Sequence, residues 1–367
     1  MKQILIALLI FSFKVNCVAQ AKESIANNSV DTFVNTKMKD LKIPGMAVAV
    51  IKNGKIIKIS TYGIANLEWQ NKVTEHTNFQ IASCTKLLTS TLLLKAINNG
   101  KLRLNDFIEK YVDSIPQQWK GIQIKHLISH SSGLKEFNGD LYASTDAVVR
   151  ALKDSTLEYM PGKGQHYAQA DFMLLGYILE RIYRKQFTEI IHDEIAVPFK
   201  MNDGRYDMEQ KKGTFMRTDQ VNQKATTYYD LEGKLEVYKF MYAQATYPAG
   251  GYFASINDMV NWAVGLDKEI FFTKDFSEKF IYGRDSIGNK ISEFTKVGWA
   301  LENEKGILYA GHSGGPGLGD VWRFPKEGYT FIVLSNDGEL KPNFARAIAS
   351  FYIKDLTPKL DIEKFER

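Results

Sequence analysis

The chain has 367 residues, of which 44% are hydrophobic and 24% charged, and this balance excludes a disordered tail, a repeat protein and a fibre. The 47 basic side chains against 42 acidic ones give a net charge of +5 without a long run of like charges, which argues against nucleic acid as a partner. Two cysteines and six scattered histidines do not provide a cysteine-rich zinc site.

The first 21 residues are typical of a secretory signal peptide. Lys2 precedes an apolar run over residues 4–13 that is too short to span a bilayer. Small residues suit signal peptidase near Ala21, so we place cleavage after Ala21, with Ala19 as an alternative. The mature chain is then residues 22–367, periplasmic or secreted and without a membrane span. Lipidation of Cys17 is an alternative, although residues 14–16 resemble the usual lipobox poorly.

The first predicted elements are a hairpin and a buried helix. Residues Gly45 to Tyr62 alternate between apolar and polar around Asn53-Gly54, a dipeptide that favours a two-residue turn between antiparallel strands. An apolar helix is expected to begin at Ser83, to run to about Ile97 and to end at Gly100 as a left-handed cap.

Helices and then strands are expected in the rest of the chain. Residues 101 to about 230 mix helical periods with turns, and Ser255 before Asp258 predicts the start of another helix. Residues 306–310, 321–324 and 329–334 are expected to be strands. This order predicts an α+β fold, with a sheet region at about 22–80 and 235–367 and a mainly helical inserted region at about 81–234. We assign both regions to one domain.

Ser83 and Lys86 are the first candidates for catalysis. If a helix begins at Ser83, a hydroxyl and an amine three residues apart lie on one face and can touch. A serine hydroxyl becomes a good nucleophile when an adjacent base takes its proton, and a helix N-terminus stabilises developing negative charge. The pair alone is equally compatible with a capping serine and a surface lysine.

Two later segments supply further groups. Tyr167 follows the turn at residues 161–164 and can project from a loop into a cleft, where cations such as Lys86 and His312 would favour its phenolate. Residues Gly311 to Gly315 lie between predicted strands, and their glycines permit close approach of a substrate to backbone amides. The alternative for Tyr167 is an ordinary half-buried tyrosine, and the alternative for residues 311–315 is a tight turn between strands.

Together these segments resemble the three motifs of the serine β-lactamase and penicillin-binding protein superfamily, namely Ser83–Lys86, Tyr167–Gln169 and His312–Gly314. Supporting segments at residues 124–134, 161–162 and 248–251 stand in the order of its class C β-lactamase, DD-peptidase and esterase branch, over about residues 30 to 350. The resemblance implies an α/β sandwich of the β-lactamase/transpeptidase type, whose antiparallel sheet is flanked by helices from both ends of the chain.

The resemblance also implies a role for each motif residue. Ser83 is the acyl-forming nucleophile, Lys86 the adjacent proton acceptor and Tyr167 the general base and acid. His312 helps to hold the phenolate and to bind a carboxylate or amide of the substrate. The remaining expected substrate and oxyanion residues are Gln169, Ser313, Gly314 and Gly315, with the backbone amides of Ser83 and Gly315 forming the oxyanion hole.

Two motif positions depart from the family pattern. Gln169 stands where asparagine is usual, so the amide expected to contact the substrate acyl side chain and Lys86 is one methylene longer. His312 stands where class C β-lactamases have lysine, a pattern more similar to DD-peptidases, D-aminopeptidases and esterases. Peptidase or esterase activity is therefore favoured over antibiotic hydrolysis.

Three features of the sequence allow rival interpretations. Residues Gly311 to Gly315 also match G-x-S-x-G, the nucleophile elbow of α/β-hydrolases, which would make Ser313 the nucleophile. That fold needs a histidine after the serine, and none follows His312. His126 and His130 are four residues apart, but they lack a third metal ligand and are expected to orient a loop. Cys84 points about 100° away from Ser83 on a helix and is expected to be a core residue.

The sequence therefore predicts an exported serine hydrolase without metal or cofactor, acting through an acyl-enzyme on Ser83. Its expected partner is a small-molecule or peptide substrate: a cell-wall-type D-amino-acid peptide or amide, or a small ester. A β-lactamase proper is one alternative. A catalytically degenerate protein that binds cell-wall peptide is another, and Gln169 is its only support. Nothing in the sequence indicates an oligomeric state.

Overall fold

The computed structural model describes residues 24–140, 142–208, 210–315, 318–338, 343–357 and 360. The predicted signal peptide, its cleavage position and Cys17 lie outside the described residues. Among the residues described, no helix combines the length and apolar character needed to cross a membrane.

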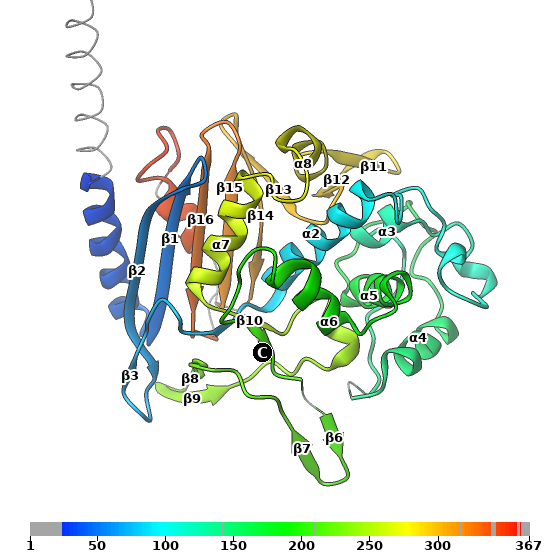
Figure 1. Ribbon diagram of the computed structural model, residues 1–367, viewed down its shortest axis with the longest axis horizontal. Helices are drawn as coiled ribbons and strands as arrows, with labels where there is room; N and C mark the ends of the chain where they lie inside the picture. Colours follow the sequence, from blue (N-terminus) through cyan, green and yellow to red (C-terminus); the bar gives the residue numbers. More distant parts are fainter. Residues whose placement is uncertain are drawn as a thin grey trace, which may run out of the picture.

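A nine-stranded antiparallel sheet forms the centre of the fold, in the order β11-β12-β13-β14-β15-β16-β1-β2-β3 (Figure 1). The two ends of the chain meet in it, because β1 pairs with β16. The strands are β1 (Gly45–Lys52), β2 (Lys55–Asn66), β3 (Asn71–Lys72), β11 (Arg284–Ile287), β12 (Lys290–Thr295), β13 (Ala300–Glu304), β14 (Ile307–Gly314), β15 (Gly319–Phe324) and β16 (Tyr329–Ser335).

The hairpin predicted from residues 45–62 is confirmed as β1 and β2. Asn53 and Gly54 both have positive φ, 49° and 71°, as the mirror-image turn of a two-residue hairpin requires. The three predicted C-terminal strands are confirmed as β14, β15 and β16, although β14 continues through the glycine-rich motif to Gly314.

Helices from both ends of the chain cover one face of the sheet, as expected for this fold. Helical residues 24–40 and α9 (Phe344–Ala349) pack Val34 and Phe344 against Val48 and Phe331 of the central strands. Each such buried side chain contributes roughly 1.5–3 kcal/mol of transfer free energy. In β14, Tyr309 belongs to this face and Ala310 to the opposite one, so successive side chains alternate between the two.

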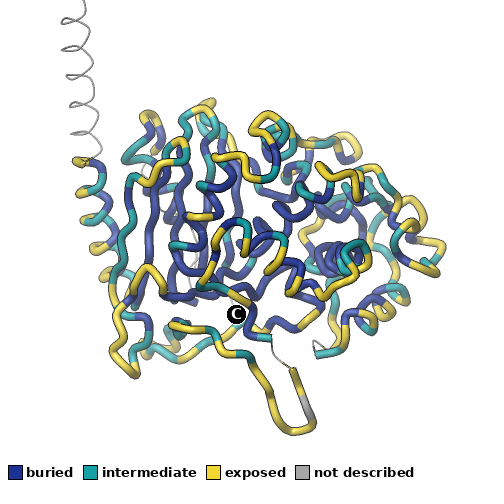
Figure 2. Tube along the Cα trace, in the orientation of Figure 1, coloured by how far each residue is buried: buried dark blue, intermediate teal, exposed yellow. Residues whose placement is uncertain are grey.

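The opposite face carries α2 (Thr85–Asn98) and α7 (Ile256–Asp267), and α2 is buried on almost all sides (Figure 2). The prediction that this helix begins at Ser83 was wrong by two residues. Ser83 lies in a 3-10 turn, η1 (Ala82–Cys84), because Ala82 has a left-handed φ of 45° and the α-helical pattern starts only at Thr85.

Local signals marked two helix ends correctly. The N–H of Gly100 bonds to Ile97 O at 3.0 Å, and the N–H of Lys101 bonds to Ala96 O at 2.9 Å, which together form the left-handed cap expected after α2. At the start of α7, Ser255 Oγ accepts a hydrogen bond from the N–H of Asp258 at 3.1 Å.

The helical region ends earlier than the sequence predicted. Residues 205–238 form short strands rather than helices, because glycines with positive φ, Gly213 and Gly233, close two tight hairpins there. The helices are α3 (Ile124–Ile128), α4 (Thr145–Asp154), α5 (Gln169–Tyr183), α6 (Phe187–Ile191) and α8 (Lys274–Ile281), with turns η2 (Ile108–Lys110), η3 (Gln117–Trp119), η4 (His192–Ala196) and η5 (Gln244–Thr246). The short strands are β4 (Phe79–Gln80), β5 (Arg205–Tyr206), β6 (Gln210–Lys212), β7 (Phe215–Arg217), β8 (Thr227–Leu231), β9 (Lys234–Tyr238) and β10 (Tyr252–Ala254).

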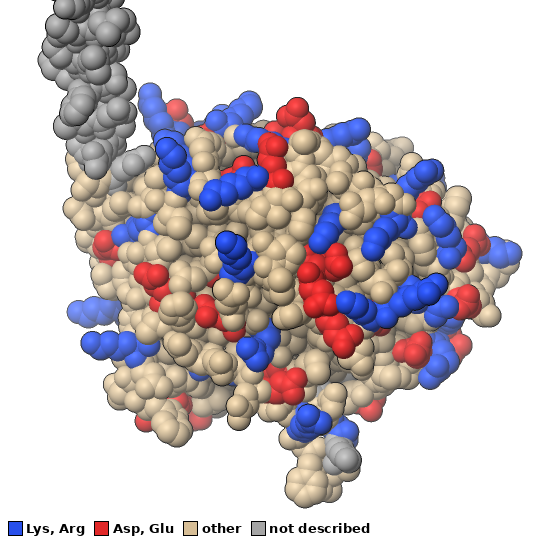
Figure 3. All heavy atoms as spheres, in the orientation of Figure 1, with Lys and Arg blue, Asp and Glu red and all other residues tan. Residues whose placement is uncertain are grey.

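Basic and acidic side chains are interspersed over the face of the molecule seen in Figure 3. The hairpin of β6 and β7 projects from this body and is largely exposed (Figure 2).

Candidate active site

Ser83, Lys86 and Tyr167 meet although 84 residues separate the serine from the tyrosine. Lys86 Nζ donates to Ser83 Oγ at 3.3 Å, and Tyr167 OH donates to the same oxygen at 3.1 Å. Ser83 comes from η1, Lys86 from the first turn of α2 and Tyr167 from the loop before α5. The contact between these three groups, which the sequence predicted, is therefore present.

Lys86 is completely buried, which is unusual for a lysine. Its Nζ also donates to Ala249 O at 2.8 Å and lies 5.0 Å from the ring centre of Tyr167 and 5.3 Å from that of Phe172. Within the described part of the chain, no carboxylate lies at ion-pair distance from this ammonium group. Its positive charge therefore acts on the serine hydroxyl and the phenol.

The position of Ser83 is set by close packing of η1 on the end of β14. A Cβ on Gly314 would lie 2.1 Å from Ile81 O and 3.0 Å from Ser83 N, so only glycine permits this approach. Cys84 Sγ donates to His312 O at 3.1 Å from within the core, which confirms the prediction that Cys84 is a core residue. Burial raises the pKa of this thiol well above its usual value.

The expected oxyanion donors lie beside this contact. No hydrogen-bond partner for Ser83 N–H is found among the described residues, and Gly315 follows directly on the strand end that packs against it. This placement is compatible with two amides facing one substrate oxygen. The oxyanion hole itself stays a prediction.

His312 lies on the same face of β14 as Ala310 and is buried, with its ring centre 6.2 Å from that of Tyr167. Its Nδ1 donates to Ser313 O at 2.6 Å, which leaves the Nε2 lone pair without a partner among the described residues. Burial, and secondarily the charge of Lys86, lowers the pKa of His312 to about 3. The expectation that His312 acts as a cation was therefore wrong, and the imidazole is a neutral acceptor.

The Ser313 side chain points to the other face of the sheet. Its Oγ donates to Asp320 Oδ1 at 2.7 Å, and Asp320 also accepts from Trp322 Nε1 and from the N–H of Ala345. Because Ser313 follows His312 in a strand, the two side chains must face in opposite directions. Ser313 can therefore act on a substrate only through its backbone, and the strand that continues through the motif gives no support to a nucleophile elbow at this position.

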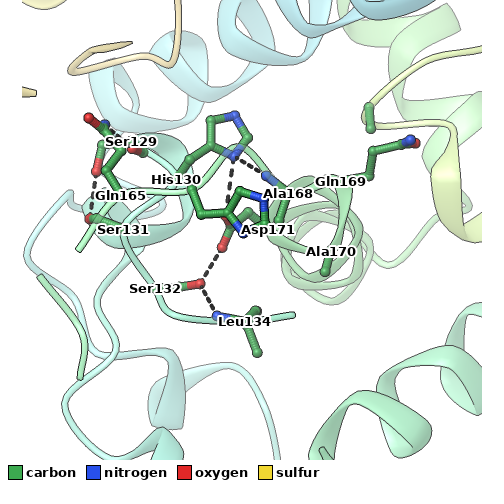
Figure 4. A network of polar contacts seen from close by, with 12 residues as sticks. Ser129, His130, Ser131, Ser132, Leu134, Gln165, Ala168, Gln169, Ala170 and Asp171 are labelled. Carbon is green, nitrogen blue, oxygen red and sulfur yellow. Dashed lines mark hydrogen bonds and ion pairs between the residues drawn. The ribbon is translucent and has the colours of Figure 1, made fainter. Parts of the chain in front are cut away.

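Gln169 is the first residue of α5, and its backbone N–H donates to Glu136 Oε2 at 2.8 Å. Its side chain points away from the neighbouring polar cluster in Figure 4. The acceptor on Lys86 is Ala249 O instead of the Gln169 amide. The structure therefore does not bring Gln169 to Lys86.

His126 and His130 have separate partners. His126 Nδ1 accepts from the N–H of Gln123 at 3.1 Å, whereas His130 Nδ1 contacts Asp171 Oδ2 at 3.2 Å. Sequence reasoning gave Asp171 no role, because a single aspartate near the start of a helix carries no signal of a buried contact 41 residues away.

The neutral state of His312 predicts a pH-dependent stability. The unfolded chain takes up a proton near pH 6.5, while the folded chain does so only near pH 3, so stability is lost as the pH falls through this window. Between pH 7 and pH 5, the native protein should lose about 2 kcal/mol more free energy of unfolding than the His312→Asn variant. Urea denaturation at both pH values measures this difference, and equal losses would contradict a neutral buried His312.

Comparisons with known proteins show the family to which the chain belongs. The family model described as Beta-lactamase matches residues 30–351. The chain belongs to the Beta-lactamase family. The match covers the three motifs and both faces of the sheet, and it places the chain in the serine β-lactamase and penicillin-binding protein superfamily.

Several relatives support the assignment. Protein flp of Staphylococcus aureus (strain MW2) is 26% identical over 327 residues, which are 85% of this chain and 63% of that protein, so the chain spans under two thirds of that relative's length. A Beta-lactamase of Escherichia coli (strain K12) is 30% identical over 203 residues, covering 55% of this chain and 53% of the other.

Two solved structures share the fold. FmtA from Staphylococcus aureus superposes with a TM-score of 0.71 at 19% identity, covering 91% of this chain and 90% of that one. An octameric penicillin-binding protein homologue from Pyrococcus abyssi gives a TM-score of 0.69 at 24% identity, covering 84% and 73%. At these identities, the two likenesses show the fold alone.

Proposed function

We propose that this protein is an exported serine hydrolase that forms an acyl-enzyme on Ser83. The observation that carries the proposal is the convergence of Lys86 Nζ and Tyr167 OH on Ser83 Oγ, at 3.3 and 3.1 Å. Two proton-transfer groups on one hydroxyl are what an activated serine nucleophile needs. Membership of a family whose fold is that of serine hydrolases supports it.

The acylation step uses these three side chains. Ser83 Oγ attacks the substrate carbonyl carbon while its proton passes to the Tyr167 oxygen, which acts as a phenolate in this step and lies beside Lys86. Tyr167 then returns this proton to the departing nitrogen or oxygen, and water repeats the sequence in deacylation. Lys86 Nζ donates to Oγ at 3.3 Å and so stabilises the negative charge that develops on this oxygen as it loses its proton. The amides of Ser83 and Gly315 would hold the tetrahedral oxyanion.

The third motif supports a substrate without a carboxylate at this position. A neutral His312 offers a lone pair at Nε2, which accepts from an N–H or O–H group and repels a carboxylate. A D-amino-acid amide, a peptide whose carboxylate lies away from His312, or a small ester therefore fits better than a substrate whose carboxylate is held by a cation there. A β-lactamase proper is the second candidate, and the E. coli relative named Beta-lactamase favours it. The contacts of Ser83 with Lys86 and Tyr167 argue against a catalytically degenerate protein that only binds peptide.

Turnover of defined substrates tests this assignment. The purified protein is mixed with a p-nitrophenyl ester, a D-alanine p-nitroanilide and a penicillin, and the release of product is followed from milliseconds to minutes. We expect a burst of about one equivalent of p-nitrophenol followed by steady turnover, and slower or no turnover of the penicillin. Absence of both burst and turnover with all three substrates would favour the degenerate binder, and rapid penicillin turnover would favour the β-lactamase.

A further inference from the structure

A buried polar cluster lies directly behind Tyr167. His130 and Asp171 are 0% and 1% exposed, and they approach each other from the loop after α3 and from the first turn of α5 (Figure 4). Ser132 Oγ donates to Asp171 Oδ1 and accepts from the N–H of Leu134 at 2.9 Å. The nucleophile contacts described above do not include this cluster.

His130 holds the chain on both sides of Tyr167. Its carbonyl oxygen accepts from the N–H of His166 at 3.0 Å, and its Nδ1 accepts from the N–H of Ala168 at 3.4 Å. Its ring lies against the phenol ring, with centroids 4.5 Å apart and planes 43° apart. His130 therefore fixes the residues on both sides of Tyr167, as well as the phenol ring, through its ring and its carbonyl group.

The backbone of His130 is itself held in an uncommon conformation. Its φ is 54°, in the left-handed region, and Tyr159 OH donates to its carbonyl oxygen at 3.2 Å. Phe172 and Phe294 pack on the ring at centroid distances of 5.4 and 4.9 Å. Because the His130 ring is held by these contacts, it can fix the position of the Tyr167 ring that packs on it.

The contact between His130 and Asp171 is best described as a neutral hydrogen bond. The single lone pair of Nδ1 is shared by two contacts, one at 3.4 Å from the N–H of Ala168 and one at 3.2 Å with Asp171 Oδ2, and in this tautomer the Asp171 carboxyl is the donor. Burial raises the pKa of Asp171 well above its usual value, and burial together with Lys86 lowers that of His130, which favours the neutral form of both. The proton of His130 then lies on Nε2, which has no hydrogen-bond partner among the described residues.

We propose that His130, with Asp171 and Ser132 behind it, is the positioning residue that holds the Tyr167 phenol on Ser83 Oγ. The inference rests on the proposed function, because it gives Tyr167 the role of proton carrier. The cluster makes no contact with the nucleophile and acts only through Tyr167. A phenol displaced by about 1 Å would lose on the order of 100-fold in rate while the substrate still binds.

Three variants separate this role from a purely structural one. Asp171→Ala removes the partner of Nδ1 and should lower the maximal rate of acylation by about 100-fold, while the p-nitrophenyl ester concentration that gives half of this first-turnover rate changes by less than about 3-fold. Asp171→Asn keeps an N–H donor for Nδ1 and an oxygen acceptor for Ser132, so it should recover most of that loss. Asp258→Ala is the matched control, since Asp258 is also buried and accepts from backbone amides, but lies in α7. It should lower the thermal midpoint without lowering the rate.

The deciding measurement repeats Asp171→Ala in a Tyr167→Phe background, with acylation followed as the rate of fluorophosphonate labelling. If the cluster acts through Tyr167, the second substitution should add less than about 2-fold to the loss. A full 100-fold loss in both backgrounds, or Asp171→Asn as damaging as Asp171→Ala, would overturn the inference. Labelling that survives Ser83→Ala, or an unchanged rate in Tyr167→Phe alone, would instead overturn the proposed function.

Discussion

Replacing Lys86 with methionine is expected to lower acylation by about 10,000-fold, because the substitution removes the buried positive charge and the hydrogen-bond donor beside Ser83 Oγ and Tyr167. Methionine has a similar length and no charge, so the packing beside Phe172 is retained. The rate of p-nitrophenol release in the burst phase measures the loss.

The same substitution should leave the fold intact or strengthen it. A buried ammonium group without a carboxylate partner costs free energy, so its removal is expected to raise the free energy of unfolding by about 1 kcal/mol. Lys95→Met is the matched control from the same helix, since Lys95 Nζ lies 4.0 Å from the ring centre of Phe271 and pairs with Glu194 at 2.9 Å. The control should keep its burst rate, and a Lys86→Met variant with a near-native burst would contradict the role of Lys86.

Replacing Tyr167 with phenylalanine is expected to slow acylation by about 1,000-fold, because no other side chain described here combines contact with Ser83 Oγ and access to a leaving group. Tyr167 is 39% exposed, so its hydroxyl can reach both the nucleophile and the substrate. Loss of this oxygen should abolish the burst and lower the maximal rate of acylation in single-turnover experiments, while the substrate concentration that gives half of this rate stays nearly unchanged.

A second tyrosine provides the control for that prediction. Tyr206→Phe removes a buried hydroxyl that donates to Tyr247 O at 3.1 Å and makes no contact with Ser83. This variant should lose some stability, on the order of 1 kcal/mol, and keep its rate of acylation. If the two variants lost activity equally, the phenol of Tyr167 would not be the proton carrier.

Local chemistry made parts of the fold predictable from the sequence. The Asn53-Gly54 turn, the left-handed cap at Gly100 and the serine cap at Ser255 each need only a few neighbouring residues, and all three are present. The pairing of β1 with β16 depends on contacts between residues about 280 positions apart, for which hydrophobic pattern gives no register. Residues 205–238 were misread because short hairpins on a surface have weak periodicity.

The candidate site shows the same division. The contact of Ser83 with Lys86 was predictable from their spacing, and its contact with Tyr167 was predictable from the resemblance to the family. The neutral state of His312 could not be foreseen, because its pKa depends on burial by distant elements. The orientation of Ser313 was foreseeable, since a strand that turns His312 inward turns its neighbour outward. The contact of Asp171 with His130 could not be predicted, because it depends on the packing of α5 against a loop 41 residues away.

Covalent labelling followed by peptide mapping tests the central claim most directly. The protein is treated with a fluorophosphonate, digested and sequenced by mass spectrometry, alongside the Ser83→Ala and Ser313→Ala variants. The account predicts one adduct per chain, located on Ser83 in the native protein and in Ser313→Ala, and no adduct in Ser83→Ala. An adduct on Ser313, or labelling that persists in Ser83→Ala, would contradict it.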